Sequence, residues 1–260
     1  MGIVINTADI TSAVGSYMWP FVRVGTMMSV APVFGTKSVP VRIRIVLALA
    51  VTFVLVPLIP MVPSVDPLSI KGLFITLHQV LIGLAIGFAL QMVFGAVVLG
   101  AQKVAMSMGL GFASIIDPEH GAQVPMLSEF YLIIATLVFI AMNGHLRLIE
   151  LLADSFQSVP VASSGISREG WFTLVGWAGR MFAGAVLISL PAVTALLVAN
   201  IAFGIISKAA PQLNIFAVGF PIMILFGFVA VMLTLSSVIP NLTNMASSAF
   251  SMIEQGLFQP

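Results

Sequence analysis

The sequence contains no cysteine and very little charge. The absence of cysteine from its 260 residues excludes disulfides, thiolate nucleophiles and iron–sulfur ligation. Charged residues make up only 7% of the chain, against about 25% in soluble domains, so polar side chains are too few to cover a water-facing surface. The formal net charge of +1 gives no bulk attraction to nucleic acid, and we expect no nucleic-acid partner.

Recognisable catalytic and metal-binding motifs are also missing. His78, His120 and His145 have no HExxH or related spacing, and without cysteine partners they form no zinc pattern. The sequence has no GxSxG elbow, no P-loop and no dinucleotide-binding glycine pattern. Asp117 and Glu119 flank a proline in a turn, which is typical of loop carboxylates rather than an acid–base pair. We therefore expect no enzyme, no metal and no cofactor.

What the chain has instead is long hydrophobic runs. Hydrophobic residues account for 60% of it, and the mean hydropathy is +1.15. This pattern predicts an all-α, polytopic membrane protein, because about 20 apolar helical residues cross the ~30 Å of bilayer hydrocarbon. Six segments qualify as candidate spans, and they are residues 12–34, 45–62, 72–102, 130–152, 181–207 and 215–239.

Two apolar stretches are too long for simple spans. Residues 72–102 contain no Asp, Glu, Lys or Arg, and as a helix they would reach roughly 46 Å, so they must tilt, kink or leave the bilayer. Residues 209–253 contain three prolines, each of which removes a backbone donor and favours a bend. We expect residues 241–259, which are rich in Ser and Asn, to form an amphipathic helix packed on protein rather than a lipid-facing span.

Small residues recur at spacings that bring helices together. Gly83 and Gly87 form a GxxxG pattern, and Gly176, Gly179 and Gly184 provide a second small face. Such faces let helix backbones approach closely in lipid. The pattern leaves open whether these helices pack within this chain or against other subunits.

Charges inside apolar segments cost at least about 2.5 kcal/mol at a helix centre, so they should face protein or water. Arg23 is the clearest case. Arg147 and Glu150 are three residues apart and can pair on one helix face, whereas Glu150 and Asp154 would repel each other unless a cation such as Arg180 lies near. We expect structural pairing at these residues, and a proton or ion relay is the alternative.

The segment between the third and fourth spans, residues 103–129, is unusual for its composition. Its first half is rich in Met and Gly and is too apolar for a free aqueous loop, and its second half contains prolines that oppose regular helix. Non-helical backbone at membrane depth survives only when it is buried in protein or lines a cavity. We expect this loop to fold back into a protein interior, and a loop lying on the bilayer surface is the alternative.

Several of these segments, taken in order, resemble the FliR family of bacterial flagellar export proteins. The first part of the chain resembles the family's N-terminal signature, and residues 111–118 resemble its central loop. The remaining matches continue in the same order over nearly the whole chain. The matching segments are Arg23–Gly25, Ala31–Gly35, Val39–Arg42, Gly111–Pro118, Asn143–His145, Asn200–Gly204, Pro211–Phe216 and Gly219–Pro221.

The resemblance implies a subunit of the type III export gate in the inner membrane, within the flagellar basal body. Family members assemble with FliP and FliQ into a helical complex, with about five FliP and four FliQ to one FliR. FlhB and FlhA adjoin it, and unfolded flagellar subunits pass through as transient partners. Residues 1–180 would then form a FliP-like region of kinked helical hairpins, and residues 181–260 a FliQ-like hairpin.

The resemblance also implies a role for the central loop, which acts in this family as a plug in the closed pore. The residues that it places there are Met106, Met108, Gly109, Leu110, Gly111, Phe112, Ile115, Ile116, Asp117 and Pro118. A related injectisome export protein of the SctT type is the nearest alternative. A secondary transporter with substrate at broken helices is a more distant one.

Overall fold

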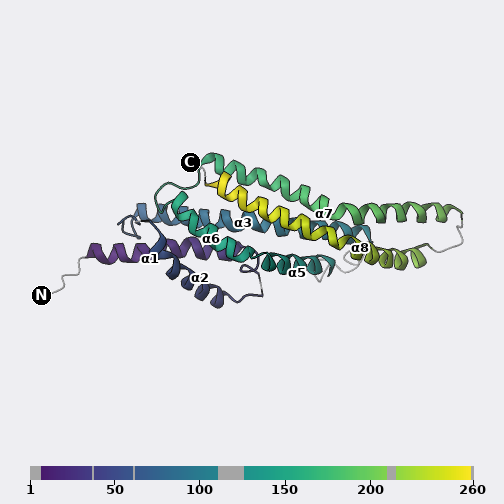
Figure 1. Cartoon of the computed structure of the whole chain (residues 1–260), viewed down its shortest axis with the longest axis horizontal. Coiled ribbons are helices and arrows are strands. Elements are labelled where there is room, and N and C mark those ends of the chain that lie inside the picture. Colours follow the sequence, from purple (N-terminus) through teal and green to yellow (C-terminus); the bar gives the residue numbers. More distant parts are fainter. Residues whose placement is uncertain (1–6, 37, 61, 111–125, 210–214, 259–260) are drawn as a thin grey trace. The chain divides into compact units, whose positions relative to one another are not determined.

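The computed structural model describes residues 7–36, 38–60, 62–110, 126–209 and 215–258, and within these ranges the regular structure is helical, without strands. The all-α prediction is therefore confirmed. The elements, labelled in Figure 1 where there is room, are α1 (Thr7–Val30), α2 (Val41–Leu55), the short turn η1 (Val56–Leu58), α3 (Ile70–Ser107), α5 (Met126–Ala141), α6 (Gly144–Ser158), α7 (Arg168–Ala209), α8 (Ile215–Met252) and the terminal turn η2 (Ile253–Leu257).

Four of these helices are long and apolar enough to cross a membrane within the described part of the chain. They are α2 with η1, α3, α7 and α8, and α5 with α6 would form a fifth if they are taken as one broken span. The polytopic membrane class is confirmed, but six spans were predicted. The first predicted span corresponds to α1, whose Ser, Thr, Tyr and Arg residues make it more polar than the others.

The fourth predicted span, residues 130–152, is not one helix. The chain is interrupted at Asn143, whose φ of 57° is left-handed, and α6 begins at the next residue. Asn tolerates this conformation better than most residues do, because its short amide side chain can bond locally. The two helices together remain a possible broken span, bent by 65°, because the segment is apolar enough on both sides of Asn143 while its backbone is interrupted there.

The amphipathic helix expected over residues 241–259 forms the last part of α8 and the turn η2, and its Leu242, Ile253 and Leu257 are buried. Helix α8 runs without interruption from Ile215 to Met252 and contains both Pro221 and Pro240. Near Pro240, the side chains of Asn241 and Ser237 donate to the carbonyls of Ser237 and Thr234, at 2.9 and 2.7 Å. Polar side chains of this kind help to satisfy backbone groups around prolines in membrane helices.

The contacts divide the chain into two compact units. Unit 1 comprises residues 1–92, 143–178 and 246–260, and unit 2 comprises residues 93–142 and 179–245. In unit 1, α1 packs on the first part of α3 at Gly83 and Gly87, where an added Cβ would meet the α1 backbone at Arg23 and Met27. The GxxxG pattern of the sequence thus serves contact within this chain.

Unit 2 is built from the second part of α3, the whole of α5 and parts of α7 and α8. The rings of Phe94 and Phe139 meet edge to face with their centroids 5.5 Å apart. Gly100 on α3 lies against the carbonyl oxygen of Ala185 on α7, at a distance that leaves no room for a Cβ. Small residues therefore set close helix approach in this unit as well.

Candidate functional site

The central loop leaves α3 through a well-defined helix end. The amide of Leu110 donates to the carbonyl of Ala105, and that of Gly109 donates to Met106, each at 3.0 Å. This is the hydrogen-bond pattern of a Schellman cap, which requires a left-handed residue just past the helix. Gly109 supplies it with a φ of 85°. Gly109 thus fixes the direction in which the chain departs.

Met108, one residue before this glycine, anchors the same point to α8. It is 1% exposed, and its Cγ, Sδ and Cε atoms fill the space where a side chain would otherwise stand on Gly227. Met106, two residues earlier, points away from this contact and is 62% exposed. The two methionines therefore have different environments, although the sequence treats them alike.

The other end of the loop is tied to α3 as well. Helix α5 begins at Met126, which is highly exposed, and the hydroxyl of the buried Ser128 donates to the carbonyl of Val98 at 3.4 Å. Both ends of the loop are thus held on unit 2. The remaining residues that the resemblance assigned to the plug lie outside the described residues, and they are Gly111, Phe112, Ile115, Ile116, Asp117 and Pro118.

Arg23 on α1 is the charged residue that the fold encloses most completely. It is 0% exposed, and its guanidinium lies 4.2 Å from the ring centroid of Phe156. Its Nε and Nη2 donate to Oε1 of Gln79 at 2.8 and 2.5 Å. Nη1 donates to the carbonyl and hydroxyl of Ser155, and Nη2 also donates to the carbonyl of Val159.

These acceptors explain how the charge is tolerated. The carbonyls of Ser155 and Val159 lie at the C-terminal end of α6, where the helix dipole places partial negative charge. The guanidinium thus caps α6 while it bonds to α3 through Gln79, so one side chain joins three helices. Gln79 Nε2, by contrast, is buried and has no hydrogen-bond partner among the described residues.

The other four charged residues that were expected to be buried or structural lie at the surface. Arg147 pairs with Glu150 at 3.2 Å, as the spacing predicted, and also with Glu254 at 2.6 Å. Its side chain is 47% exposed, so solvent reduces the strength of both pairs. Asp154 and Arg180 are exposed too, since each lies on a helix face that the chain does not cover.

Three residues of these clusters were missed from the sequence. Gln79 stands as a lone amide in the apolar first half of α3, which is a signal that could have been read. Ser155 and Glu254 give no such signal, because they meet Arg23 and Arg147 across 132 and 107 residues. Within the described ranges, no group of three or more His, Cys, Asp or Glu residues could hold a metal ion.

Comparison with known proteins gives a consistent result over nearly the whole chain. The sequence pattern of the family described as "Bacterial export proteins, family 1" matches residues 14–249. A protein named "Flagellar biosynthetic protein FliR" from Pectobacterium carotovorum subsp. carotovorum is 33% identical, over 99% of this chain and 98% of its own length. The chain belongs to the FliR family of bacterial export proteins.

Other FliR proteins agree. The FliR of Escherichia coli strain K12 is 33% identical over 91% of this chain and 90% of its own length. The FliR of Bacillus subtilis strain 168 is 28% identical over 89% and 90%. As a FliR family member, the chain is a component of the flagellar export apparatus in the inner membrane at the basal body. Its long apolar helices fit this location.

Proposed function

We propose that this FliR family member is a non-enzymatic subunit of the export gate, and that it helps to form the channel entrance for unfolded flagellar subunits. Its partners in this proposal are FliP and FliQ, in the proportion of about five and four to one, with FlhB and FlhA adjoining. The channel wall does no covalent chemistry, so energy for transport comes from partners or from the membrane potential.

The lengths of three helices carry the proposal. At about 1.5 Å per residue, the 38 residues of α3 and of α8 reach about 57 Å, and the 42 residues of α7 reach about 63 Å. The hydrocarbon layer is about 30 Å thick, so lipid covers only about half of each helix. Apolar side chains remain exposed along α7, from Phe182 to Ile206. Neighbouring subunits are the cover that suits the remaining length.

We place the boundary between a FliP-like region and a FliQ-like hairpin at residue 180. Residues 1–180 contain the helices up to the start of α7, and residues 181–260 contain most of α7 and all of α8. The exposed small residues Gly176 and Gly179, which have no atom within 4 Å of an added Cβ, would let a partner helix approach closely near this boundary.

Residues 106–123, which comprise the end of α3 and the central loop after it, are proposed to close the pore. An apolar segment excludes water and ions, and a gate of this kind opens when the segment moves aside. Support comes from its two ends, because Met108 is packed against Gly227 and Ser128 is bonded to Val98. A seal must be held at both ends to resist the membrane potential, and here both ends are tied to α-helices.

A pair of deletions tests the seal. Deleting residues 106–123 should make cells with the assembled gate leaky to small solutes and ions. Deleting only residues 111–123 keeps the Met108 contact and the Gly109 helix end, and should produce the same leak if the loop itself is the seal. Solute leakage equal to that of the intact gate in both variants would contradict the proposed sealing role of residues 106–123, provided that immunoblots show normal levels of the chain.

Co-purification tests the partners. A tagged chain extracted from flagellated cells should bring down FliP and FliQ in fixed proportion. The rival function, a secondary transporter, predicts that the chain works alone after reconstitution. Uptake of a small solute by vesicles that contain only this chain would therefore favour the rival. An injectisome role predicts that a deletion strain keeps its flagella, whereas the proposed role predicts loss of swimming.

A further inference from the structure

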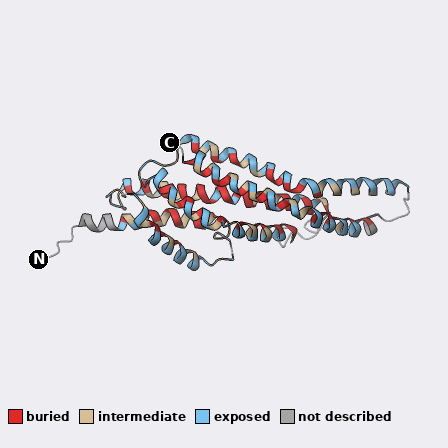
Figure 2. Ribbon diagram, viewed as in Figure 1, coloured by how far each residue is buried: buried red, intermediate tan, exposed pale blue. Residues whose placement is uncertain are grey.

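Helix α2 is apolar and largely uncovered by its own chain. With η1 it forms an 18-residue stretch whose mean hydropathy of 2.2 nearly equals the 2.3 of α3. Yet only 17% of this stretch is buried, against 67% for α3, and Figure 2 shows the contrast between the two helices. Its exposed large side chains are Val41, Ile43, Ile45, Val46, Leu47, Leu49, Phe53, Val54 and Leu58.

The chemistry of this face suits lipid chains better than a protein helix. Where helices of this chain meet, as at Gly83 and Gly87, small residues bring the backbones together. Apart from Arg42 near its start, the exposed residues of α2 are instead bulky Val, Ile, Leu and Phe, with one alanine and no acidic residue. Exposed bulky side chains also occur on α7, but the 18 residues of α2 with η1 reach only about 27 Å, so the hydrocarbon layer can cover this helix over its whole length.

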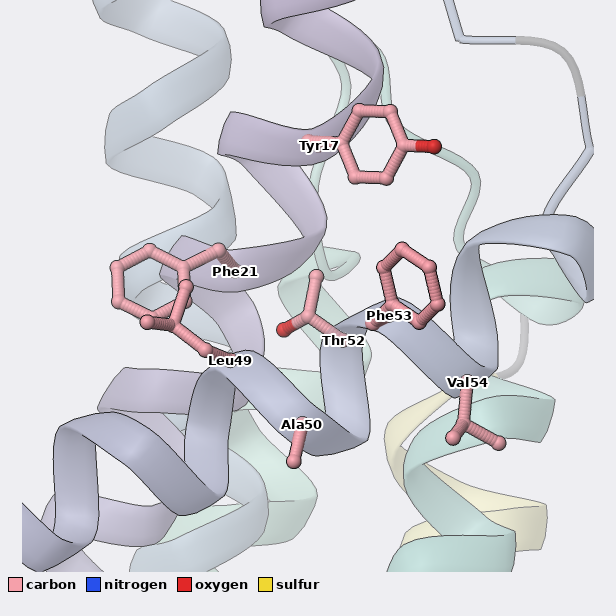
Figure 3. A pocket seen from close by; sticks show the side chains of 7 residues that line it. All are labelled: Tyr17, Phe21, Leu49, Ala50, Thr52, Phe53 and Val54. Atoms are coloured by element: carbon pink, nitrogen blue, oxygen red, sulfur yellow. The ribbon is translucent and has the colours of Figure 1, made fainter.

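A cavity of about 530 Å³ lies between α2 and α1 within unit 1. It is lined by Tyr17 and Phe21 from α1 and by Leu49, Ala50, Thr52, Phe53 and Val54 from α2, as Figure 3 shows. The Thr52 hydroxyl already donates a hydrogen bond to the carbonyl of Ala48 at 2.7 Å, so it needs no polar ligand as an acceptor. The walls are therefore suited to an alkyl chain, and the volume is in the range of ordinary ligand sites.

The basic residues of α2 lie at one end of it. Arg42 is exposed and precedes Leu49 and Phe53 by seven and eleven residues, so it shares their helix face. Arg44 lies on another face, where Nη2 donates to the carbonyls of Thr36 and Val39 at 3.1 and 3.3 Å. Its buried Nε has no partner among the described residues. Arg42 is thus the cation on the cavity's side of the helix, and Arg44 adds charge beside it.

The axial distances match the layers of a bilayer leaflet. Leu49 and Phe53 lie about 10 and 16 Å beyond Arg42 along the helix. The headgroup layer is about 5–7 Å thick on each side of the hydrocarbon. When Arg42 stands at the level of the phosphates, the cavity therefore opens within the acyl chains of the same leaflet.

We propose that α1 and α2 form a binding site for an anionic phospholipid. Its phosphate bonds to Arg42 in the positive field of Arg44, and one acyl chain occupies the cavity against Phe21, Leu49 and Phe53. The site is independent of the central loop and of any role of the loop in sealing. It would hold this part of the chain at a fixed depth in the membrane.

The test replaces Phe53 by photo-reactive benzoylphenylalanine in the full chain, expressed in flagellated cells with the whole export apparatus. After irradiation, intact mass spectrometry of the purified chain distinguishes a phospholipid adduct from a polypeptide adduct. We expect phospholipid, with phosphatidylglycerol and cardiolipin enriched about fivefold over their share of the bulk membrane. The same probe at the buried Phe94 should give no lipid adduct.

Charge variants then test the headgroup contact. Arg42→Gln should return the adducts to the bulk lipid composition, whereas Lys71→Gln, an exposed basic residue at the start of α3, should leave the enrichment unchanged. A polypeptide adduct at Phe53 overturns the proposal, because a partner protein then fills the site. So does an absence of adducts at normal chain abundance, or a lipid composition that Arg42→Gln does not change. Each of these readouts is separate from leakage and from swimming.

Discussion

The guanidinium of Arg23 donates two hydrogen bonds to a single oxygen, Oε1 of Gln79, at 2.8 and 2.5 Å. One amide therefore receives both bonds that join α1 to α3 at this point. The remaining donors of Arg23 reach the end of α6. These bonds should contribute strongly to stability, because buried hydrogen bonds of a charged group contribute more than neutral ones.

Replacing Arg23 by methionine should lower the free energy of unfolding by about 3 kcal/mol or more, since buried acceptors on Gln79 and Ser155 lose their donor. Thermal unfolding of the detergent-purified chain measures the loss. Arg168→Met is the matched control, because Arg168 is exposed, lies 5.5 Å from the Phe172 ring centroid and should cost under about 1 kcal/mol. Equal melting temperatures for the two variants would show that the buried network adds no stability.

Glycine-to-alanine changes should have different effects on stability at Gly83 and at Gly176. At Gly83 an added Cβ meets the α1 backbone, so Gly83→Ala should destabilise the chain by about 1–3 kcal/mol. At Gly176 the space is open, so Gly176→Ala should be neutral or should stabilise by up to about 1 kcal/mol. Calorimetry on both variants is the measurement, and a loss at Gly176 as large as at Gly83 would contradict the packing described.

A larger residue at Gly176 tests whether a neighbouring subunit packs on this face of α7. Gly176→Leu should leave the isolated chain folded, because its surroundings are empty. If a neighbouring subunit packs there, the same variant should no longer co-purify with its partners, since close approach of two backbones depends on small side chains. Unchanged recovery of the whole complex would place that face of α7 outside any subunit contact.

Met108 and Met106 should respond differently to truncation. Met108→Ala removes a fully buried side chain and should cost about 2–5 kcal/mol, whereas Met106→Ala, at an exposed position, should fall within about 0.5 kcal/mol. Gly227→Leu should also destabilise the chain, because the new leucine side chain would occupy the space that the Met108 side chain fills. If the loop seals the pore, Met108→Ala and Gly227→Leu should also raise solute leakage in cells. A leak from Met106→Ala alone would contradict the anchoring role of Met108.

The ion pair between Arg147 and Glu254 should be weak. Both side chains are partly exposed, so their coupling energy in a double-mutant cycle should be about 0.2–1 kcal/mol and should shrink in high salt. Arg147→Glu should be largely rescued by Glu254→Arg. A coupling energy above about 2 kcal/mol would mean that neighbouring subunits enclose the pair in the assembled state.

Local signals in the sequence predict some of these features, whereas others depend on tertiary contacts between distant residues. A charge within an apolar stretch marks Arg23 as a residue that needs partners, but those partners lie 56 and 132 residues away and depend on tertiary packing. Proline removes a backbone donor, yet α8 is helical through Pro221 and Pro240, and polar side chains beside Pro240 bond to nearby carbonyls. Conversely, Asn143 ends a helix inside a stretch that hydropathy treats as continuous.

The left-handed residue at Asn143 has a consequence for biosynthesis. By hydropathy, residues 126–158 form one segment for the membrane-insertion machinery. In the folded chain they form two helices of 16 and 15 residues, about 24 and 22 Å long. Each piece is shorter than the hydrocarbon is thick, so lipid around either one would have to thin. Contact with neighbouring protein subunits along either piece would remove the need for such thinning, so the bend at Asn143 suits a chain that is covered partly by lipid and partly by protein.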